Sequence, residues 1–126
     1  MKIIRVIAAV MLALPLLFFG GAYYFHPPAL PPANGQVGLE MLQLMRVGGL
    51  TVPVTISHIL AGVFLLIPRT RFLAALLQLP MTIGIVAFHA TMWPEGIPPA
   101  LVMLVLNVVV LIEPERWRAL VASKES

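Results

Sequence analysis

Four long stretches of this 126-residue chain contain no Asp, Glu, Lys or Arg, and they constrain its fold more than any other feature. They cover residues 6–25, 47–68, 72–94 and 96–112. A helix that crosses a bilayer needs about 20 mainly apolar residues, which the first three stretches reach and the fourth approaches. Because 60% of the residues are hydrophobic and only 10% are charged, no separate soluble domain fits. The sequence therefore predicts an integral membrane protein.

The expected fold is an all-α, antiparallel four-helix membrane bundle with a short outer amphipathic helix. Proline-rich residues 26–32 cannot continue a helix, and Gly48-Gly49 lets the chain pivot back toward the membrane. Between these breaks, Gln36, Glu40, Gln43 and Arg46 recur at steps of three or four, which is typical of a helix at the membrane interface. We predict spans at about 4–25, 48–67, 72–93 and 97–113, an outer amphipathic segment at 36–47 and a cytoplasmic tail at 114–126.

The basic residues gather at alternate breaks between the apolar stretches. Lys2, Arg5, Arg69, Arg71, Arg116, Arg118 and Lys124 all fall on one predicted side, and Arg46 falls on the other. By the positive-inside rule, both termini are cytoplasmic, and we expect a multi-pass protein of a bacterial inner membrane. This pattern accounts for the net charge of +3 through membrane orientation, so no nucleic-acid partner is predicted.

The first apolar stretch has two interpretations. Residues 1–22 have the basic start, apolar centre and small terminal residues of a signal peptide. The aromatic residues that follow, Tyr23 to Phe25, favour a retained helix with an interfacial anchor, and we interpret Trp93 and Trp117 as anchors too. Pro15 and Gly20-Gly21 predict a bend or a close helix contact in this stretch.

Polar side chains in the second and third stretches follow helical spacing. Thr51, Thr55, His58 and Gly62 are four, three and four residues apart, and Gln78, Thr82, Ile85 and His89 repeat these steps. The short break at 68–71 makes the two helices an antiparallel hairpin. At equal depth, Gly62 then faces Gln78, and His58 faces Thr82. We expect one polar seam between these helices, which Asn107 joins from the fourth stretch.

Two roles for this seam are open. Polar and small residues hold membrane helices together, with hydrogen bonds worth about 0.6 to 2 kcal/mol each. Alternatively the seam lines a ligand pocket or a proton path, because ionisable groups at membrane depth are costly and usually face a partner or a cavity. The ligand-binding candidates are His58, Gln78, Thr82, His89 and Asn107, and the outer-rim candidates are His26, Glu40 and Arg46.

Neither a metal site nor a haem site is predicted. On the hairpin, His58 and His89 differ by seven residues in depth, which is roughly 10 Å at about 1.5 Å per residue and awkward for one iron. The chain has no Cys and no Asp to complete a ligand set. A membrane enzyme with a histidine acid or base is the least favoured reading, because no nucleophile or carboxylate pair accompanies either ring, and no catalytic residue is predicted.

Several short motifs follow one another along nearly the whole chain. They are Phe25-His26-Pro27-Pro28, Pro31-Pro32, Leu60-Ala61-Gly62, Phe64-Leu65-Leu66, the turn from Arg69 to Arg71, Phe88-His89, Pro94, Gly96, Pro98 and Asn107. Their order and spacing resemble the DoxX-like family of small four-helix membrane proteins. Relatives are expected to carry an acidic residue before the Ile-Leu-Ala-Gly stretch. This chain has His58 there, so an acid-dependent activity of relatives does not carry over.

The resemblance implies an accessory subunit of a quinone-linked redox or oxidative-stress system, without catalytic activity of its own. A quinone is the only cofactor that it suggests. The alternatives are a small-molecule binder or transporter that uses the seam and a purely structural membrane subunit. The expected partners are the lipid bilayer, a redox-enzyme subunit or a second copy of the chain.

Overall fold

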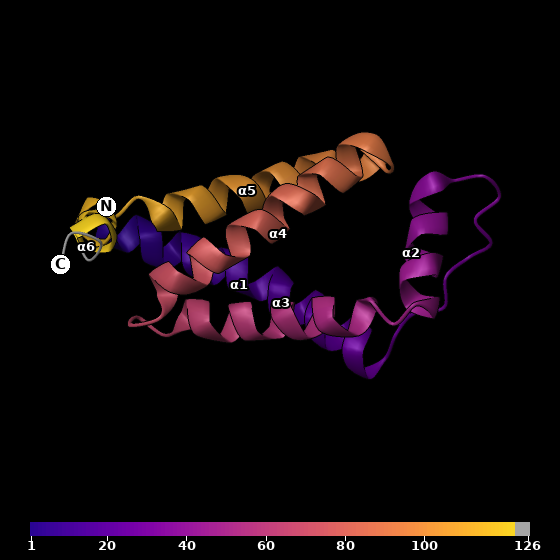
Figure 1. The fold of residues 1–126 in the computed structure, drawn as a ribbon, viewed down its shortest axis with the longest axis horizontal. Coiled ribbons are helices and arrows are strands. Elements are labelled where there is room, and N and C mark those ends of the chain that lie inside the picture. The colour runs from indigo at the N-terminus through magenta and orange to yellow at the C-terminus, as the bar shows by residue number, and fades with distance from the viewer. Residues whose placement is uncertain (123–126) are drawn as a thin grey trace.

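The computed structural model describes residues 1–122, and all regular structure in this part of the chain is helical, which confirms the all-α prediction (Figure 1). Residues 123–126 of the predicted tail, Lys124 among them, lie outside the described part. The elements are α1 (Lys2–Phe25), α2 (Val37–Val47), α3 (Thr51–Leu66), α4 (Arg71–Thr91), the 3-10 turn η1 (Pro94–Gly96), α5 (Ile97–Leu111) and α6 (Pro114–Ala122).

Three helical stretches of the described chain are long and apolar enough to cross a membrane: Lys2–Phe25, Arg71–Thr91 and Pro94–Leu111. A fourth crossing exists if α2 and α3 count as one bent span. The 16 residues of α3 alone extend about 24 Å, which is short of the roughly 30 Å of a bilayer core. The chain therefore has three to four potential spans.

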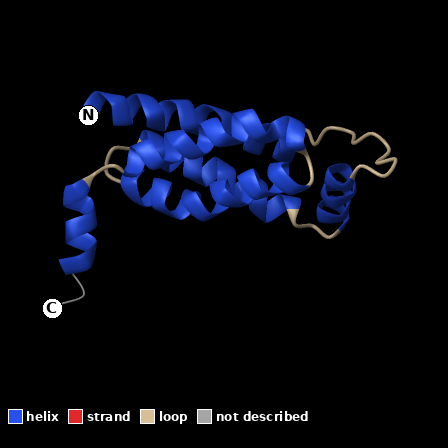
Figure 2. Ribbon diagram, turned by 90° about the horizontal axis from the view of Figure 1, so that it is seen from above, coloured by secondary structure: helices blue, strands red, loops and turns tan. Residues whose placement is uncertain are grey.

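The helix α2 stands almost at right angles to α3, with 93° between their axes. Gly49 makes the bend between them with a φ of +76°, a conformation that costs glycine little and other residues more. The segment between α1 and α2 is irregular, as its prolines require. Figure 2 shows α2 at one end of the bundle, the α2 end, and α6 at the other, the α6 end.

The helix α1 lies at the centre of the packing, against both α3 and α5. It supplies five of the eleven residues in the main buried cluster of the described chain, Ala8, Ala9, Leu12, Ala13 and Leu16. Two glycines bring it close to α3. A Cβ on Gly20 would lie 3.0 Å from the carbonyl oxygen of Thr55, and one on Gly62 would lie 2.6 Å from Cγ of Leu17. The close helix contact expected at Gly20 is therefore present.

The hairpin helices α3 and α4 contact each other less than α1 contacts α3 or α4 contacts α5. Figure 1 shows α3 and α4 diverging from their turn toward α2. At the turn they are held together, because the Thr70 hydroxyl donates to the Phe64 carbonyl at 2.8 Å and Arg71 Nε donates to the Leu65 carbonyl at 2.9 Å. These carbonyls belong to the last turn of α3, where no helical amide is available.

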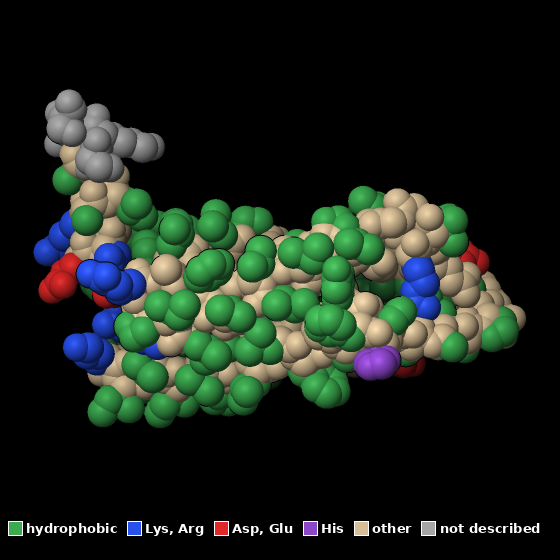
Figure 3. Space-filling model, turned by 90° about the horizontal axis from the view of Figure 1, so that it is seen from below, with side chains coloured by type: hydrophobic (Ala, Val, Ile, Leu, Met, Phe, Trp, Pro, Cys, Tyr) green, Lys and Arg blue, Asp and Glu red, His purple; other side chains and the backbone are tan. Residues whose placement is uncertain are grey.

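At the α6 end, a salt bridge connects the beginning of the chain to the end of its last long helix. Arg5 of α1 forms a salt bridge of 3.0 Å with Glu113, which follows α5, and both side chains are largely buried. Most basic side chains on the face in Figure 3 gather at this end. Arg46, the last basic residue of α2, lies at the opposite end. The described chain thus has the unequal charge distribution that the sequence predicts.

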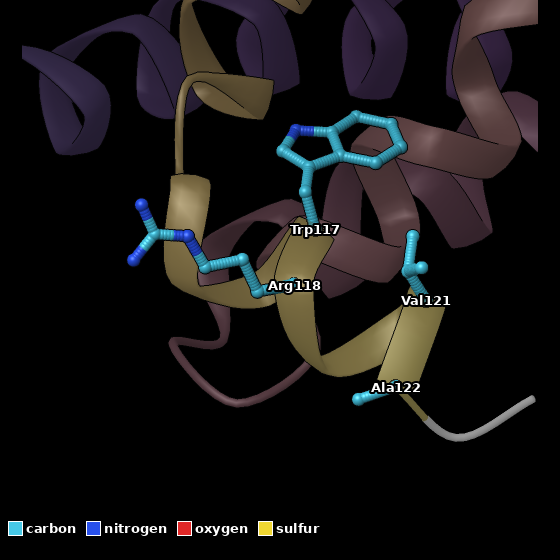
Figure 4. Close-up of a pocket in the computed structure, with 4 residues that line it drawn as sticks. All are labelled: Trp117, Arg118, Val121 and Ala122. Atoms are coloured by element: carbon cyan, nitrogen blue, oxygen red, sulfur yellow. The ribbon is translucent and has the colours of Figure 1, made fainter. Parts of the chain in front are cut away.

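The helix α6 packs through one aromatic side chain. The Trp117 indole donates to the Leu111 carbonyl at 2.7 Å and meets the Phe72 ring edge to face, with 5.2 Å between centroids. Figure 4 shows Trp117 pointing toward the bundle and Arg118 extending to one side of α6. A shallow hollow of about 370 Å³ lies between these residues, Val121 and Ala122. Its four lining residues all come from α6, so it is a surface depression of this helix.

Candidate ligand-binding cavity

A cavity of about 750 Å³ lies at the α2 end, in the space that the divergence of α3 and α4 opens. All four long helices contribute to its wall, and α2 and the proline-rich segment cover it. A hollow is visible at this end of the face in Figure 3, beside the basic side chain. Ligand sites in proteins typically measure about 300 to 1,000 Å³ and combine an apolar wall with a few polar groups. The size of this cavity suits a small organic molecule.

The wall is mainly apolar and aromatic. Its apolar residues come from several helices and include Phe19 of α1, Leu39 and Met45 of α2, Phe88 of α4 and Met103 of α5. Thr51, Thr55, His58 and His89 are polar wall residues from the two divergent helices, and Arg46 lies at the cover. The cavity therefore offers apolar contact area with a small number of hydrogen-bonding groups.

His58 is held by its own helix. Its Nδ1 lies 2.7 Å from the carbonyl oxygen of Val54, one turn earlier in α3. A carbonyl oxygen only accepts hydrogen bonds, so Nδ1 carries the proton and donates it. The Cβ of His58 also packs beside Gly20 of α1, since a Cβ at Gly20 would lie 3.1 Å from it. Two neighbours thus fix the ring at the cavity wall.

His89 is fixed in the same way at the end of α4. Its Nδ1 lies 3.0 Å from the carbonyl oxygen of Trp93, which follows the helix. The ring also rests on Gly96 of η1, because a Cβ at Gly96 would collide with Nδ1 and Cε1 of His89. Gly96 has a φ of −89°, so glycine is required here for space and not for backbone conformation. The 3-10 turn therefore sets the position of the ring.

The cover of the cavity is anchored by side chains of α2. Arg46 donates from one terminal nitrogen to the Pro28 carbonyl at 2.6 Å, and Gln43 Nε2 donates to the Pro31 carbonyl at 3.1 Å. Gly38 allows close contact with Trp93, whose Cε3 would lie 3.0 Å from a Cβ at this position. These contacts place α2 across the open end of the bundle.

The three predicted rim residues are separated in the structure. Arg46 lines the cavity, whereas His26 and Glu40 are exposed and are not part of its wall. Neither His26 nor Glu40 is therefore a wall residue beside His89, which lines the cavity.

The predicted seam divides into two parts. His58 and His89 line the cavity, whereas Gln78, Thr82 and Asn107 form a buried hydrogen-bonded cluster between α4 and α5. Thr82 donates to Asn107 Oδ1 at 2.8 Å, and Asn107 Nδ2 donates to the Ala75 carbonyl at 2.8 Å. Gln78 Nε2 lies 3.4 Å from the Thr82 hydroxyl oxygen. This half of the seam joins two helices, and none of its three residues lines the cavity.

The prediction that the stripes of α3 and α4 face each other along their length is wrong. Gly62 packs against Leu17 and Ala13 of α1 instead of Gln78. The hairpin turn fixes the relative depth of residues in α3 and α4. However, α3 packs mainly against α1 and α4 packs mainly against α5, so the two stripes face different neighbours. His58 and Thr82 consequently belong to different environments.

Sequence analysis missed the parts of the cavity that α1 and α2 provide. Phe19 and Gly20 of α1 line it, as does Trp93, which we had interpreted as an interfacial anchor. Gly96, which the sequence analysis names only among the motifs of the family resemblance, lines it too. The available signal was a glycine three residues after an aromatic residue at the end of a span, because a small residue there leaves room for a neighbouring ring.

No group of three or more His, Cys, Asp or Glu side chains within residues 1–122 is placed to hold a metal ion.

Comparison with known proteins gave no match to a family model, to a curated protein or to a solved structure. The site must therefore be interpreted from its own geometry: an apolar cavity with two oriented imidazole rings.

Proposed function

We propose that the protein is a four-span membrane protein that binds a small, mostly apolar molecule in the cavity at its α2 end. The observation that carries this proposal is the cavity itself, at about 750 Å³ and lined by residues from all four long helices. Its polar groups converge from α3 and α4, as expected for a site that orients a ligand. The hollow on α6 is a weaker candidate, since it is shallow and formed by one helix.

The proposed orientation puts both termini in the cytoplasm of a bacterial cell, with the α2 end on the outer side of the inner membrane. The distribution of basic residues supports it, and the salt bridge between Arg5 and Glu113 places the beginning of α1 and the residue after α5 together at the α6 end. In this orientation the cavity lies in the outer half of the bilayer. A lipid-soluble molecule would reach it from the membrane.

The resemblance to the DoxX-like family supports a more specific role, that of an accessory subunit of a quinone-linked redox or oxidative-stress system. An apolar cavity of this size accommodates the ring of a quinone and part of its tail. The role proposed is binding and presentation of the molecule to a partner enzyme, because the cavity offers an apolar wall with two oriented imidazole rings.

Native mass spectrometry of the protein, extracted gently from its own membrane, tests this proposal. We expect a retained small molecule that is lost from His58→Leu. His26→Leu is the matched control, because it makes the same replacement at an exposed histidine outside the cavity. A co-purifying oxidase subunit would support the accessory role, whereas a retained molecule without a partner would favour an independent binder or transporter. Bulk lipid alone in all three proteins would refute the binding function.

A further inference from the structure

Three polar groups of the cavity wall share one property: each already donates its hydrogen within the protein. Thr55, His58 and His89 each direct a hydrogen toward a backbone carbonyl oxygen of the protein. A group that has given its hydrogen away can offer an occupant only a lone pair. The direction of hydrogen bonding between wall and ligand is therefore set before the ligand arrives.

His58 and His89 lead to the same conclusion independently. In each neutral ring, Nδ1 donates to a carbonyl, at 2.7 Å to Val54 and at 3.0 Å to Trp93, so Nε2 carries no proton. Neither Nε2 has a hydrogen-bond partner among the described residues. The only buried side-chain nitrogen or oxygen of residues 1–122 without a partner is Arg5 Nε, so both Nε2 atoms remain accessible.

Thr55 adds a third acceptor from the same face of α3. Its hydroxyl donates to the Val52 carbonyl at 2.9 Å, and the side chain is 7% exposed, at the cavity wall. The hydroxyl can then offer a ligand only the lone pairs of its oxygen, as an acceptor. Thr55 and His58 are three residues apart, so they lie on one side of the helix.

Donors are found at the cover and not among these three groups. The Arg46 guanidinium donates from one nitrogen to Pro28 and carries further N–H groups at the cavity edge. The side chains of Tyr23, Gln36 and Thr51 also line the cavity and make no hydrogen bond to a described residue, so each is free to donate or to accept. The wall thus contains three fixed acceptors, at Thr55, His58 and His89, and its donors belong to other residues.

We propose that the cavity selects a mostly apolar molecule that donates hydrogen bonds, such as a phenol or a quinol, over the corresponding ether or quinone. A carbonyl oxygen of a quinone would face the lone pairs of Thr55, His58 or His89 without a hydrogen between them. A buried polar group without a partner binds less well than one that is paired. This inference rests on the proposed binding function and specifies its ligand as the reduced, hydroxyl-bearing form.

The test compares three probes with nearly the same ring: durohydroquinone, its dimethyl ether and duroquinone. The protein is embedded in lipid nanodiscs under anaerobic conditions as the Trp117→Phe variant, so that Trp93 is its single tryptophan and reports from the cavity wall. The measured quantity is the concentration of half-maximal fluorescence change, corrected with empty nanodiscs for partition into lipid. The comparison among probes needs no substitution in the cavity.

We expect durohydroquinone to bind at least about tenfold more tightly than the ether and the quinone, which corresponds to about 1.4 kcal/mol. His58→Leu and His89→Leu should each reduce this preference, and His26→Leu should keep it. Equal binding of the three probes, or tighter binding of the quinone, would overturn the selection of donors and leave the binding function intact. Saturation by none of them would also overturn the inference, and the native mass spectrum would then decide separately whether the cavity holds another molecule.

Discussion

Thr82 and Asn107 join α4 to α5 through a hydrogen bond of 2.8 Å between side chains that are both 0% exposed. Asn107 extends the connection with a second hydrogen bond to the Ala75 carbonyl, about two turns earlier in α4 than Thr82. These bonds hold the two helices together nearer the α6 end than the cavity residues Ile85 and Met103. The rigid pair α4 and α5 then forms one wall of the cavity, with α1 and α3 opposite.

Replacement of Asn107 by Leu should destabilise the bundle without removing the ligand site. The change deletes two interhelical hydrogen bonds and leaves the Thr82 hydroxyl without this partner, so we expect a loss of about 1 to 2 kcal/mol in free energy of unfolding. Unfolding in bicelles with increasing SDS measures it. Val105→Leu, at an exposed position of α5, is the control. An unchanged stability of Asn107→Leu would mean that this cluster is not what holds the helices together.

Gly20→Ala should weaken the contact between α1 and α3. The new methyl group would lie 2.9 Å from Cγ1 of Ile59 and 3.0 Å from the Thr55 carbonyl oxygen, and the backbone cannot move away without separating the helices. We expect a loss of about 1 to 3 kcal/mol in free energy of unfolding, in the range of other overpacked sites.

Gly21→Ala is the matched control for this substitution. A Cβ at Gly21 meets nothing within 4 Å, and alanine is the better helix former, so we expect stability to rise by up to about 1 kcal/mol. Both variants are compared by the same bicelle unfolding measurement. Similar effects of the two substitutions would show that helix propensity, and not the contact with α3, determines the result.

The sequence predicted the helices well because their limits are set locally. Charge-free stretches define the long helices, and the prolines after Phe25 end α1 for lack of amide donors. The predicted amphipathic segment 36–47 corresponds closely to α2 at Val37–Val47, since its polar spacing follows a single helix. In the same way, the spacing of Thr55 and His58 placed both on one face of α3.

Which neighbouring helix each polar face of α3 and α4 contacts was not predictable from the hairpin alone. Depth along α3 and α4 follows from the short turn, but the rotation of each helix depends on α1 and α5, which make the larger contacts. Gly62 shows the difficulty, since a glycine on a polar stripe fits equally well against Gln78 or against Leu17. Lipid-facing and cavity-facing apolar residues also look alike in sequence, so Phe19 could not be assigned to the cavity.

Gly96→Ala should weaken ligand binding with little effect on folding. The added methyl group would occupy the place of the His89 ring, which must then rotate away and give up its hydrogen bond to Trp93. We expect durohydroquinone binding to weaken about tenfold, or about 1.4 kcal/mol. The free energy of unfolding should change by less than about 1 kcal/mol, because the φ of Gly96 suits alanine.

The control for Gly96→Ala is Gly84→Ala in α4. A Cβ at Gly84 meets nothing within 4 Å, so this variant should bind the probe as the unchanged protein does. Fluorescence titration with the Trp117→Phe background measures binding in both. If Gly96→Ala bound durohydroquinone normally, the position of the His89 ring would not matter for the ligand.

Single cysteines test the orientation on which the location of the cavity depends, because the chain has none of its own. The excess of basic residues at the α6 end predicts that this end stays in the cytoplasm. A membrane-impermeant maleimide should therefore label Ala33→Cys in intact spheroplasts, and should label Pro68→Cys and Ser126→Cys only after the membrane is opened. Labelling of Pro68→Cys in intact spheroplasts would reverse the orientation and move the cavity to the cytoplasmic half of the bilayer. A ligand would then reach the cavity from the cytoplasmic leaflet, and a partner enzyme that draws on the site would have to act on that side.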